Sequence, residues 1–251
     1  MLSKNKIKFV NSLHKSKYRK INRKYIVEGH KPVLEWLENG NYIDTCYASK
    51  KWVLDYPEIY DKYREWIEIA EEKDIKACSQ LTNFSPVILI ANMPEEEKIN
   101  SSLFENNNLI LVLDRIQDPG NLGTIIRSAD WFGLKKIIVL KGTVDTYNNK
   151  VIQSSMGSVL RVDIIEMEEE ELLLFAKEND IELLVADMEG AALEKQSISK
   201  PSFLILGNEG QGVSLVLQNK ANKKLKIHGK GGAESLNVAI SAAVFLFALD
   251  F

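Results

Sequence analysis

Two glycine-rich segments near the C-terminal end carry residue types that could form a ligand site. They are Phe203-Leu-Ile-Leu-Gly-Asn-Glu-Gly-Gln-Gly-Val-Ser214 and Ile227-His-Gly-Lys-Gly-Gly-Ala-Glu-Ser-Leu-Asn-Val-Ala-Ile-Ser241. Glycine lets the backbone turn tightly and approach a ligand, because it has no Cβ. The free N–H groups at a helix start can bind an anionic group. One such loop is adequately explained by helix capping, but two in tandem favour a ligand site.

A third polar loop lies upstream and is framed by regular elements. The apolar run Leu109–Leu113 predicts a strand, Asp114–Asn121 a long loop, and Leu122–Phe132 a helix that Gly133 ends. Lys136–Leu140 predicts a second strand. This is the pattern of a βαβ unit with a parallel strand pair.

The remainder of the second half continues the alternation of strands and helices. Helices are predicted at Val151–Val159, Glu168–Asn179 and Leu236–Phe251, and strands at Arg161–Ile165, Leu183–Ala186, Phe203–Leu206 and Leu225–Ile227. The last helix is apolar on nearly every face, which is typical of a buried helix.

The first half reads as a small α/β sandwich that ends before a polar, turn-rich stretch. Predicted strands are Lys24–Glu28, Ile43–Ala48, Ile75–Cys78, Leu81–Phe84 and Val87–Ala91, and predicted helices are Val33–Glu38 and Tyr60–Lys73, with a basic helix or arm at 11–20. We therefore expect one domain over residues 1–97, a linker over 98–107, and a second domain over 108–251.

Composition narrows the class of protein. The chain has 251 residues, of which 45% are hydrophobic and 27% charged, as in an ordinary soluble globular protein. The sequence shows no apolar run of membrane-spanning length and no signal peptide. The cysteines, Cys46 and Cys78, and the three histidines lack metal-site spacing. We expect a cytoplasmic protein with reduced thiols and no metal.

Charge is distributed unevenly along the chain. Residues 1–31 hold ten Lys or Arg residues against one acid, Glu28, and five lysines occur between 220 and 230. Such runs are often solvated surface, but two of them, one beside the glycine-rich segments, favour contact with RNA phosphates. The candidate RNA-binding residues are Lys17, Arg19, Arg23, Lys24 and Arg115, and for the first four a solvated basic face is an equal alternative.

Three motifs together resemble those of the SpoU (TrmH-type) RNA ribose methyltransferases. The first is Leu113-Asp-Arg-Ile-Gln-Asp-Pro-Gly-Asn-Leu-Gly-Thr-Ile-Ile-Arg-Ser-Ala-Asp-Trp-Phe-Gly133, the second is Leu206–Ser214, and the third is Glu234-Ser-Leu-Asn-Val-Ala-Ile-Ser-Ala-Ala243. They occur in family order over roughly 140 residues, which is far more specific than a single glycine motif. The basic N-terminal part resembles the ribosomal-protein-like substrate-binding domain that often precedes this catalytic domain.

The resemblance implies a SPOUT fold, a parallel α/β domain whose C-terminal segment forms a trefoil knot, which is a rare exception to unknotted topology. It also implies S-adenosylmethionine as the cofactor, methyl transfer to a ribose 2′-hydroxyl, and a homodimer whose active site is completed across the subunit interface.

Site residues carry over at the matching positions. The implied catalytic residues are Asn121, Arg127, Glu209, Ser235 and Asn237, and the implied cofactor contacts are Leu206, Gly207, Asn208, Gly212, Ile227, Gly229 and Leu236. Ser155 and Gly157 match a family Ser-x-Gly that precedes an arginine, here Arg161. The family's Ile-Pro-Met is replaced by Ile227-His228-Gly229-Lys230, which loosens the cofactor loop.

Arg127 raises a question of chemistry. A guanidinium is almost never deprotonated, so it is a poor free-standing general base. We interpret Arg127 as a residue that grips the target phosphate and lowers the pKa of the ribose hydroxyl, with the proton passing to that phosphate or to water. The alternatives are ordinary ones: Arg127 as a surface arginine, Asn121 as a helix N-cap, Glu209 as a turn acid and Trp131 as a core residue.

Several functions compete. An RNA 2′-O-ribose methyltransferase is favoured, with ribosomal RNA ranked ahead of transfer RNA by the two-domain arrangement alone. A non-catalytic RNA-binding module would be favoured by loss of Asn121, Arg127 or Asn237, and all three are present. A dinucleotide-dependent oxidoreductase is disfavoured, because no strand leads into Gly-x-Gly-x-x-Gly at the start of a long helix.

Overall fold

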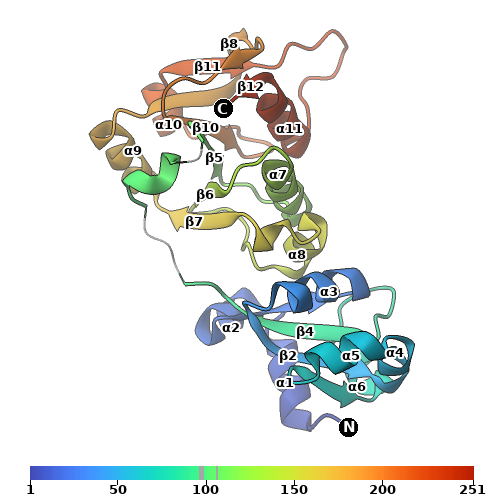
Figure 1. Ribbon diagram of the computed structural model, residues 1–251. Coiled ribbons are helices and arrows are strands. Elements are labelled where there is room, and N and C mark those ends of the chain that lie inside the picture. Colours follow the sequence, from blue (N-terminus) through green and yellow to red (C-terminus); the bar gives the residue numbers. More distant parts are fainter. Residues whose placement is uncertain (96–98, 106) are drawn as a thin grey trace. The chain divides into compact units, whose positions relative to one another are not determined.

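The chain forms two compact units in a computed structural model that describes residues 1–95, 99–105 and 107–251 (Figure 1). The first unit comprises Met1–Glu95 and Asp145–Leu160, and the second comprises Glu96–Val144 and Arg161–Phe251. Residues 96–98 and 106, which belong to the predicted end of the first domain and to the predicted linker, lie outside the described residues.

The first unit contains a four-stranded sheet in the order β1-β4-β2-β3. Its elements are α1 (Lys4–Ser12), α2 (Ser16–Asn22), β1 (Lys24–Glu28), α3 (His30–Asn39), β2 (Ile43–Ser49), α4 (Lys50–Asp55), α5 (Pro57–Tyr63), β3 (Ile67–Ala70), α6 (Glu72–Cys78), β4 (Val87–Asn92), α8 (Asn149–Ser155) and the 3₁₀ turn η2 (Ser158–Leu160). Both β1 and β2 pair antiparallel with β4, so these two strands run in the same direction.

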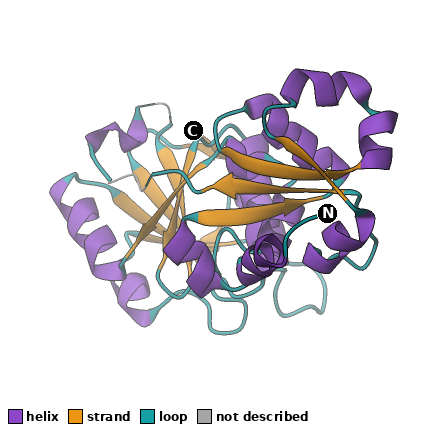
Figure 2. Ribbon diagram, turned by 90° about the horizontal axis from the view of Figure 1, so that it is seen from below, coloured by secondary structure: helices purple, strands orange, loops and turns teal. Residues whose placement is uncertain are grey.

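Both faces of this sheet are buried, as expected for an α/β sandwich (Figure 2). Tyr25 and Val27 of β1 belong to one hydrophobic cluster, while Ile26 between them belongs to another. Successive side chains of a strand point to opposite faces, so helices must cover both sides to exclude water from these residues.

Three predictions in the first unit are wrong. The predicted helix Tyr60–Lys73 is broken: α5 ends at Tyr63, and Ile67–Ala70 instead forms β3, parallel to β2. Residues Ile75–Cys78, predicted as a strand, lie in α6, whose first turn carries the acids Glu72 and Asp74 that favour a helix N-terminus. Residues 81–84 contain no strand. In these short segments, pairing and packing outweigh local periodicity.

A buried ion pair in the first unit joins α2 to the returning segment 145–160. Arg19 is only 2% exposed, and its Nη2 and Nε donate to Asp145 Oδ2 at 2.8 and 3.1 Å. Its Nη1 donates to the Leu13 carbonyl at 2.8 Å. Burial acts to raise the pKa of Asp145, but hydrogen bonds from Ser16, Arg19 and the Tyr147 backbone hold it below its usual value. The prediction that Arg19 contacts RNA is therefore wrong, because its guanidinium is committed internally.

Replacement of Arg19 by methionine is expected to destabilise the protein by about 3 kcal/mol, because it leaves the Asp145 carboxylate buried without its cation. Urea unfolding at pH 7 measures the change. The folded-state pKa of Asp145 lies below its unfolded value, so its stabilising contribution is present above the unfolded value and disappears as the pH falls through the folded one. Lys17→Met on the exposed side of the same helix is the control, and equal unfolding midpoints for the two variants would contradict the assignment.

The second unit contains a six-stranded sheet in the order β11-β8-β10-β5-β6-β7, in which every neighbouring pair is parallel. Its elements are η1 (Ser101–Phe104), β5 (Leu109–Asp114), α7 (Pro119–Trp131), β6 (Lys136–Leu140), β7 (Asp163–Met167), α9 (Glu169–Glu178), β8 (Glu182–Ala192), β9 (Gln196–Ser197), β10 (Ser202–Gly207), α10 (Leu215–Lys220), β11 (Lys223–Lys226), α11 (Val238–Ala248) and β12 (Leu249–Asp250). The predicted βαβ unit and parallel α/β class are confirmed.

The helices α7 and α11 pack against each other in this unit (Figure 1). The apolar α11 is not buried on every face as predicted, because Ile240 and Phe247 are 53% and 69% exposed. Trp131, interpreted from sequence as a core residue, is 83% exposed at the end of α7. These side chains are apolar surface that this chain does not cover by itself.

Two searches of the described residues bear on function. No described helix is long and apolar enough to cross a membrane. Within the same residues, no cluster of three or more His, Cys, Asp or Glu side chains is arranged to hold a metal ion.

Candidate functional site

The site is built where the adjacent parallel strands β5 and β10 end. Their register pairs Leu113 with Leu206 and Asp114 with Gly207, so the loops that follow leave the same edge of the sheet. Ligands of open parallel α/β sheets bind beyond the carboxyl ends of the strands. The first and second sequence motifs are thereby brought side by side.

The loop after β10 is a closed turn with very little internal space. Asn208 and Gly212 exchange backbone hydrogen bonds of 3.1 and 2.9 Å, and the Asn208 Oδ1 accepts from the N–H groups of Gly210 and Gln211. A Cβ at Gly207 would lie 2.1 Å from the Val213 nitrogen. Glycine is therefore required at 207 by backbone contact.

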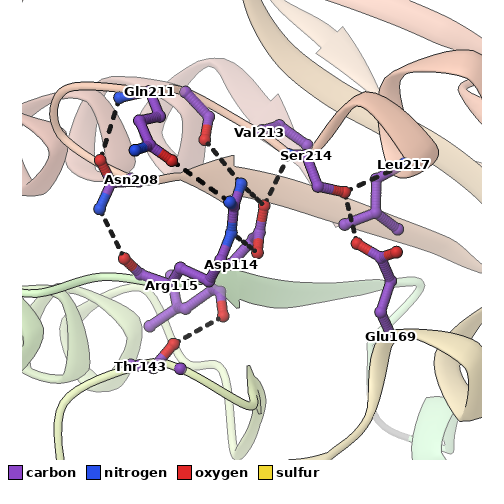
Figure 3. Close-up of polar contacts among 12 residues, drawn as sticks. Asp114, Arg115, Thr143, Glu169, Asn208, Gln211, Val213, Ser214 and Leu217 are labelled. Carbon is purple, nitrogen blue, oxygen red and sulfur yellow. Dashed lines mark hydrogen bonds and ion pairs between the residues drawn. The ribbon is translucent and has the colours of Figure 1, made fainter.

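An aspartate–arginine pair after β5 ties the two loops together (Figure 3). Asp114 is buried, accepts from the Ser214 N–H at 2.7 Å, and is bound by Arg115 Nε at 2.8 Å. The Arg115 carbonyl accepts from Asn208 Nδ2 at 2.9 Å. Arg115 was predicted to contact RNA, yet its guanidinium is bound to Asp114, so in this structure the side chain positions the loop.

Three predicted catalytic residues, one from each motif, form a continuous hydrogen-bonded chain. Asn237 Nδ2 donates to Asn121 Oδ1 at 2.9 Å, and Asn121 Nδ2 donates to Glu209 Oε1 at 3.0 Å. Asn237 Oδ1 also caps α11 by accepting from the N–H of Ala239. Asn121 is not the cap of α7, because Asp118 holds that position and accepts from the Asn121 N–H.

Glu209 is held as a carboxylate by its neighbours. Partial burial acts to raise its pKa, but hydrogen bonds from Asn121 and from the backbone of Gln117 and Asp118 outweigh it and place the pKa below its usual range. The two backbone N–H groups lie 3.2 Å from the carboxylate oxygens. An ionised acid that only accepts hydrogen bonds suits a positioning role better than proton donation.

Arg127 lies apart from this chain of hydrogen bonds. It is exposed on α7, and no hydrogen bond or ion pair joins it to another residue that the structure describes. Six helical residues separate it from Asn121, and at about 100° per residue the two side chains leave different sides of the helix. One chain alone does not bring its Asn121 and Arg127 together.

The predicted cofactor residues surround the same sheet edge, and their surfaces suit an adenosyl group. Leu206 is buried at the end of β10, whereas Leu236 is 47% exposed between the exposed residues Ser235 and Asn237. Gly229, in the loop after β11, has no atom within 4 Å of a built Cβ, and Ile227 before it is half-buried. Glycine backbone with no covering side chain and an exposed leucine allow close approach of an apolar ring and its polar edge.

The remaining predicted residues are less concentrated. Ser155 and Gly157 belong to the first unit, where the Ser155 hydroxyl donates to the Ile152 carbonyl. Arg161 belongs to the second unit and pairs with Asp130 at 2.8 Å. The analysis of motifs missed Asp114 and Gln117 as organising residues, although the first ends a buried strand and polar residues at such positions signal a site.

The basic residues predicted to contact RNA are mostly engaged within the chain. Lys24 pairs with Asp44 at 2.5 Å, and Arg23 donates to the Pro94 carbonyl. Lys17 is exposed. In the second basic stretch, Lys223 and Lys224 pair with Glu182 and Asp187.

Comparison with known proteins matches residues 108–247 to the SpoU rRNA methylase family and residues 4–88 to the MRM3-like substrate-binding domain. The chain is 29% identical to a 23S rRNA (guanosine(2553)-2′-O)-methyltransferase, RlmP, of Bacillus subtilis, over 97% of this chain and 95% of that protein. A structure assigned to the TrmH family of RNA methyltransferases from Porphyromonas gingivalis superposes with a TM-score of 0.83 at 32% identity, covering 99% and 98% of the two chains. An AdoMet-bound rRNA methyltransferase from Sinorhizobium meliloti gives 0.83 at 27% identity, covering 99% and 95%.

Proposed function

The chain belongs to the SpoU rRNA methylase family, and we propose that it methylates a ribose 2′-hydroxyl in ribosomal RNA with S-adenosylmethionine as the methyl donor. Residues 108–251 would carry out the transfer and residues 1–97 would bind the RNA, in the cytoplasm. The match of residues 4–88 to a substrate-binding domain model and the full-length likeness to an enzyme named for 23S rRNA support this reading.

The observation that carries the proposal is the hydrogen-bonded chain Asn237–Asn121–Glu209. It joins all three motifs at the edge where β5 and β10 end. Side chains that are more than a hundred residues apart in sequence are thereby held in fixed positions, and positioning accounts for a large share of the rate in transfer reactions.

The cofactor supplies an electrophilic methyl group on a sulfonium. Leu206, Gly207, Asn208 and Gly212 of one loop, and Ile227, Gly229 and Leu236 of the other, would hold it. Asn121, Asn237 and Ser235 would orient the ribose oxygen, with Glu209 fixing the Asn121 amide. Arg127 would bind the phosphate next to the target and lower the pKa of the hydroxyl, and the phosphate or water would accept its proton.

We further propose that the active enzyme is a homodimer. Arg127 leaves α7 on a different side from Asn121, so a second subunit is needed to bring an arginine to each site. Trp131, Ile240 and Phe247 supply exposed apolar surface on the two helices that would face the partner. Exposed apolar side chains in a contiguous patch are typical of an interface.

Phe247→Glu is expected to convert the dimer to monomers, because it places a charge in the apolar contact. Sedimentation velocity measures the mass. Leu174→Glu, at an exposed leucine on α9 (58% exposed), is the matched control and should leave the dimer intact. A monomeric wild-type protein with full activity would overturn the dimer proposal.

The activity itself is tested by incubating the protein with labelled S-adenosylmethionine and unmodified 23S, 16S or transfer RNA. Label at one alkali-resistant position of rRNA is the expected result. Label only in tRNA would keep the chemistry and make this a tRNA 2′-O-methyltransferase. Cofactor binding without label would point to another acceptor, and no cofactor binding would favour a non-catalytic RNA-binding module.

A further inference from the structure

The first unit carries an aromatic cluster at its surface that the catalytic motifs do not explain. The rings of His30 and Tyr56 stack with centroids 4.2 Å apart and an interplanar angle of 27°. The buried Trp52 donates its indole N–H to His30 Nδ1 at 2.9 Å. Tyr56 remains 37% exposed, so part of its ring faces solvent.

The hydrogen bond from Trp52 determines the form of His30. Because Nδ1 accepts, the proton of the neutral ring is on Nε2, where it can be donated. Burial, and then the charge of Lys31, lower the pKa of His30 below its usual value. His30 therefore presents a neutral ring with an available donor.

This cluster lies at one defined edge of the four-stranded sheet. His30 follows the end of β1, and Lys50–Tyr56 follow the end of β2, which runs in the same direction. Arg23 and Lys24, at the start of β1, lie at the opposite edge, about 16 Å away at 3.3 Å per residue.

Three lysines flank the cluster and are free to act. Lys31, Lys50 and Lys51 are exposed, and none forms a hydrogen bond or ion pair with another part of the described chain. Arg19, Arg23 and Lys24, by contrast, are all engaged within the first unit. The cations available for phosphates are thus at the His30 edge.

We propose that His30 and Tyr56 form a platform on which an unpaired base of the rRNA substrate stacks, with Lys31, Lys50 and Lys51 binding the adjoining phosphates. The inference rests on the proposed function and assigns the RNA-contacting edge of the first unit. Asp55 and Glu58 flank Tyr56 in sequence, which disfavours a phosphate at the ring itself and favours an uncharged base face there.

The physical basis is the way proteins recognise RNA. Sequence-specific contacts are made mostly to unpaired bases, which stack on aromatic side chains and pair with donors at their edges. Lysines add attraction for the backbone that weakens with salt. A rigid stacked pair loses little freedom on binding, because Trp52 already holds His30 in place.

Two variants test the platform, with in vitro transcribed 23S rRNA as the probe. Tyr56→Leu keeps an apolar side chain but removes the ring, and should raise the KM for RNA roughly tenfold while kcat and the Kd for S-adenosylmethionine are unchanged. Tyr56→Phe should retain the wild-type KM, because the stacking face is preserved.

A charge-matched pair of triple variants tests the lysines. Lys31, Lys50 and Lys51 changed together to alanine should weaken RNA binding and flatten its salt dependence. Lys4, Lys8 and Lys76, exposed on α1 and α6, changed together to alanine should not. Equal losses in the two triple variants, or a wild-type KM in Tyr56→Leu, would overturn the platform. Absence of methyl transfer by the wild-type protein would instead overturn the proposed function.

Discussion

Replacement of Arg127 by lysine is expected to lower kcat for methyl transfer by roughly 100-fold, the effect of removing one well-placed donor to developing charge, while leaving the Kd for S-adenosylmethionine unchanged. Arg127 is exposed on α7 and bound to no other described residue, so the substitution does not disturb the fold. Lysine keeps the positive charge but lacks the planar fork that holds a phosphate with two parallel hydrogen bonds.

Single-turnover kinetics and calorimetric titration with the cofactor separate the two effects. A loss in kcat and kcat/KM of equal size indicates an interaction made only in the transition state. Arg64→Lys, an exposed arginine of the first unit, is the control and should turn over normally. Near-normal turnover by the Arg127 variant would show that the fork is not used.

Gly207→Ala is expected to weaken cofactor binding by about 100-fold, or about 2.7 kcal/mol. The added Cβ would lie 2.1 Å from the Val213 nitrogen and 2.2 Å from the Gly212 carbonyl carbon. Both are backbone atoms, so the loop must move as a whole. The Asn208–Gly212 hydrogen bonds, and with them the placement of Glu209, would be lost.

Gly210→Ala is the matched control in the same loop. The nearest atom to a Cβ there is Asn208 Oδ1 at 3.7 Å, which is ordinary van der Waals contact. Calorimetric titration should therefore give a near wild-type Kd for Gly210→Ala and a much weaker one for Gly207→Ala. Equal affinities in the two variants would mean that the closed form of the loop is not the binding form.

The local signals that predicted the fold correctly were continuous and long. The apolar runs of β5, β6 and β10 and the helix after the first motif were identified because buried parallel strands contain few polar residues. The short amphipathic segments between residues 60 and 78 were misassigned, because strand pairing of β3 with β2 is a long-range choice that periodicity does not report.

The candidate site shows the same division. The motifs named Asn121, Glu209 and Asn237, but only the structure shows that these three side chains are bonded to one another. Asp114 and Arg115, which tie the two loops together, were assigned to RNA or passed over, because an ion pair between adjacent residues is not distinguishable in sequence from surface charge.

The sequence by itself determined the family, the cofactor class and the parallel α/β architecture, because the motifs and apolar strands are local properties of the chain. Only the tertiary structure decided which charged residues are available for RNA. Arg19 is neutralised by Asp145, 126 positions away, whereas Lys31, Lys50 and Lys51 reach solvent beside the stacked rings. Burial and ion pairing depend on partners distant in sequence, and folding alone brings those partners together.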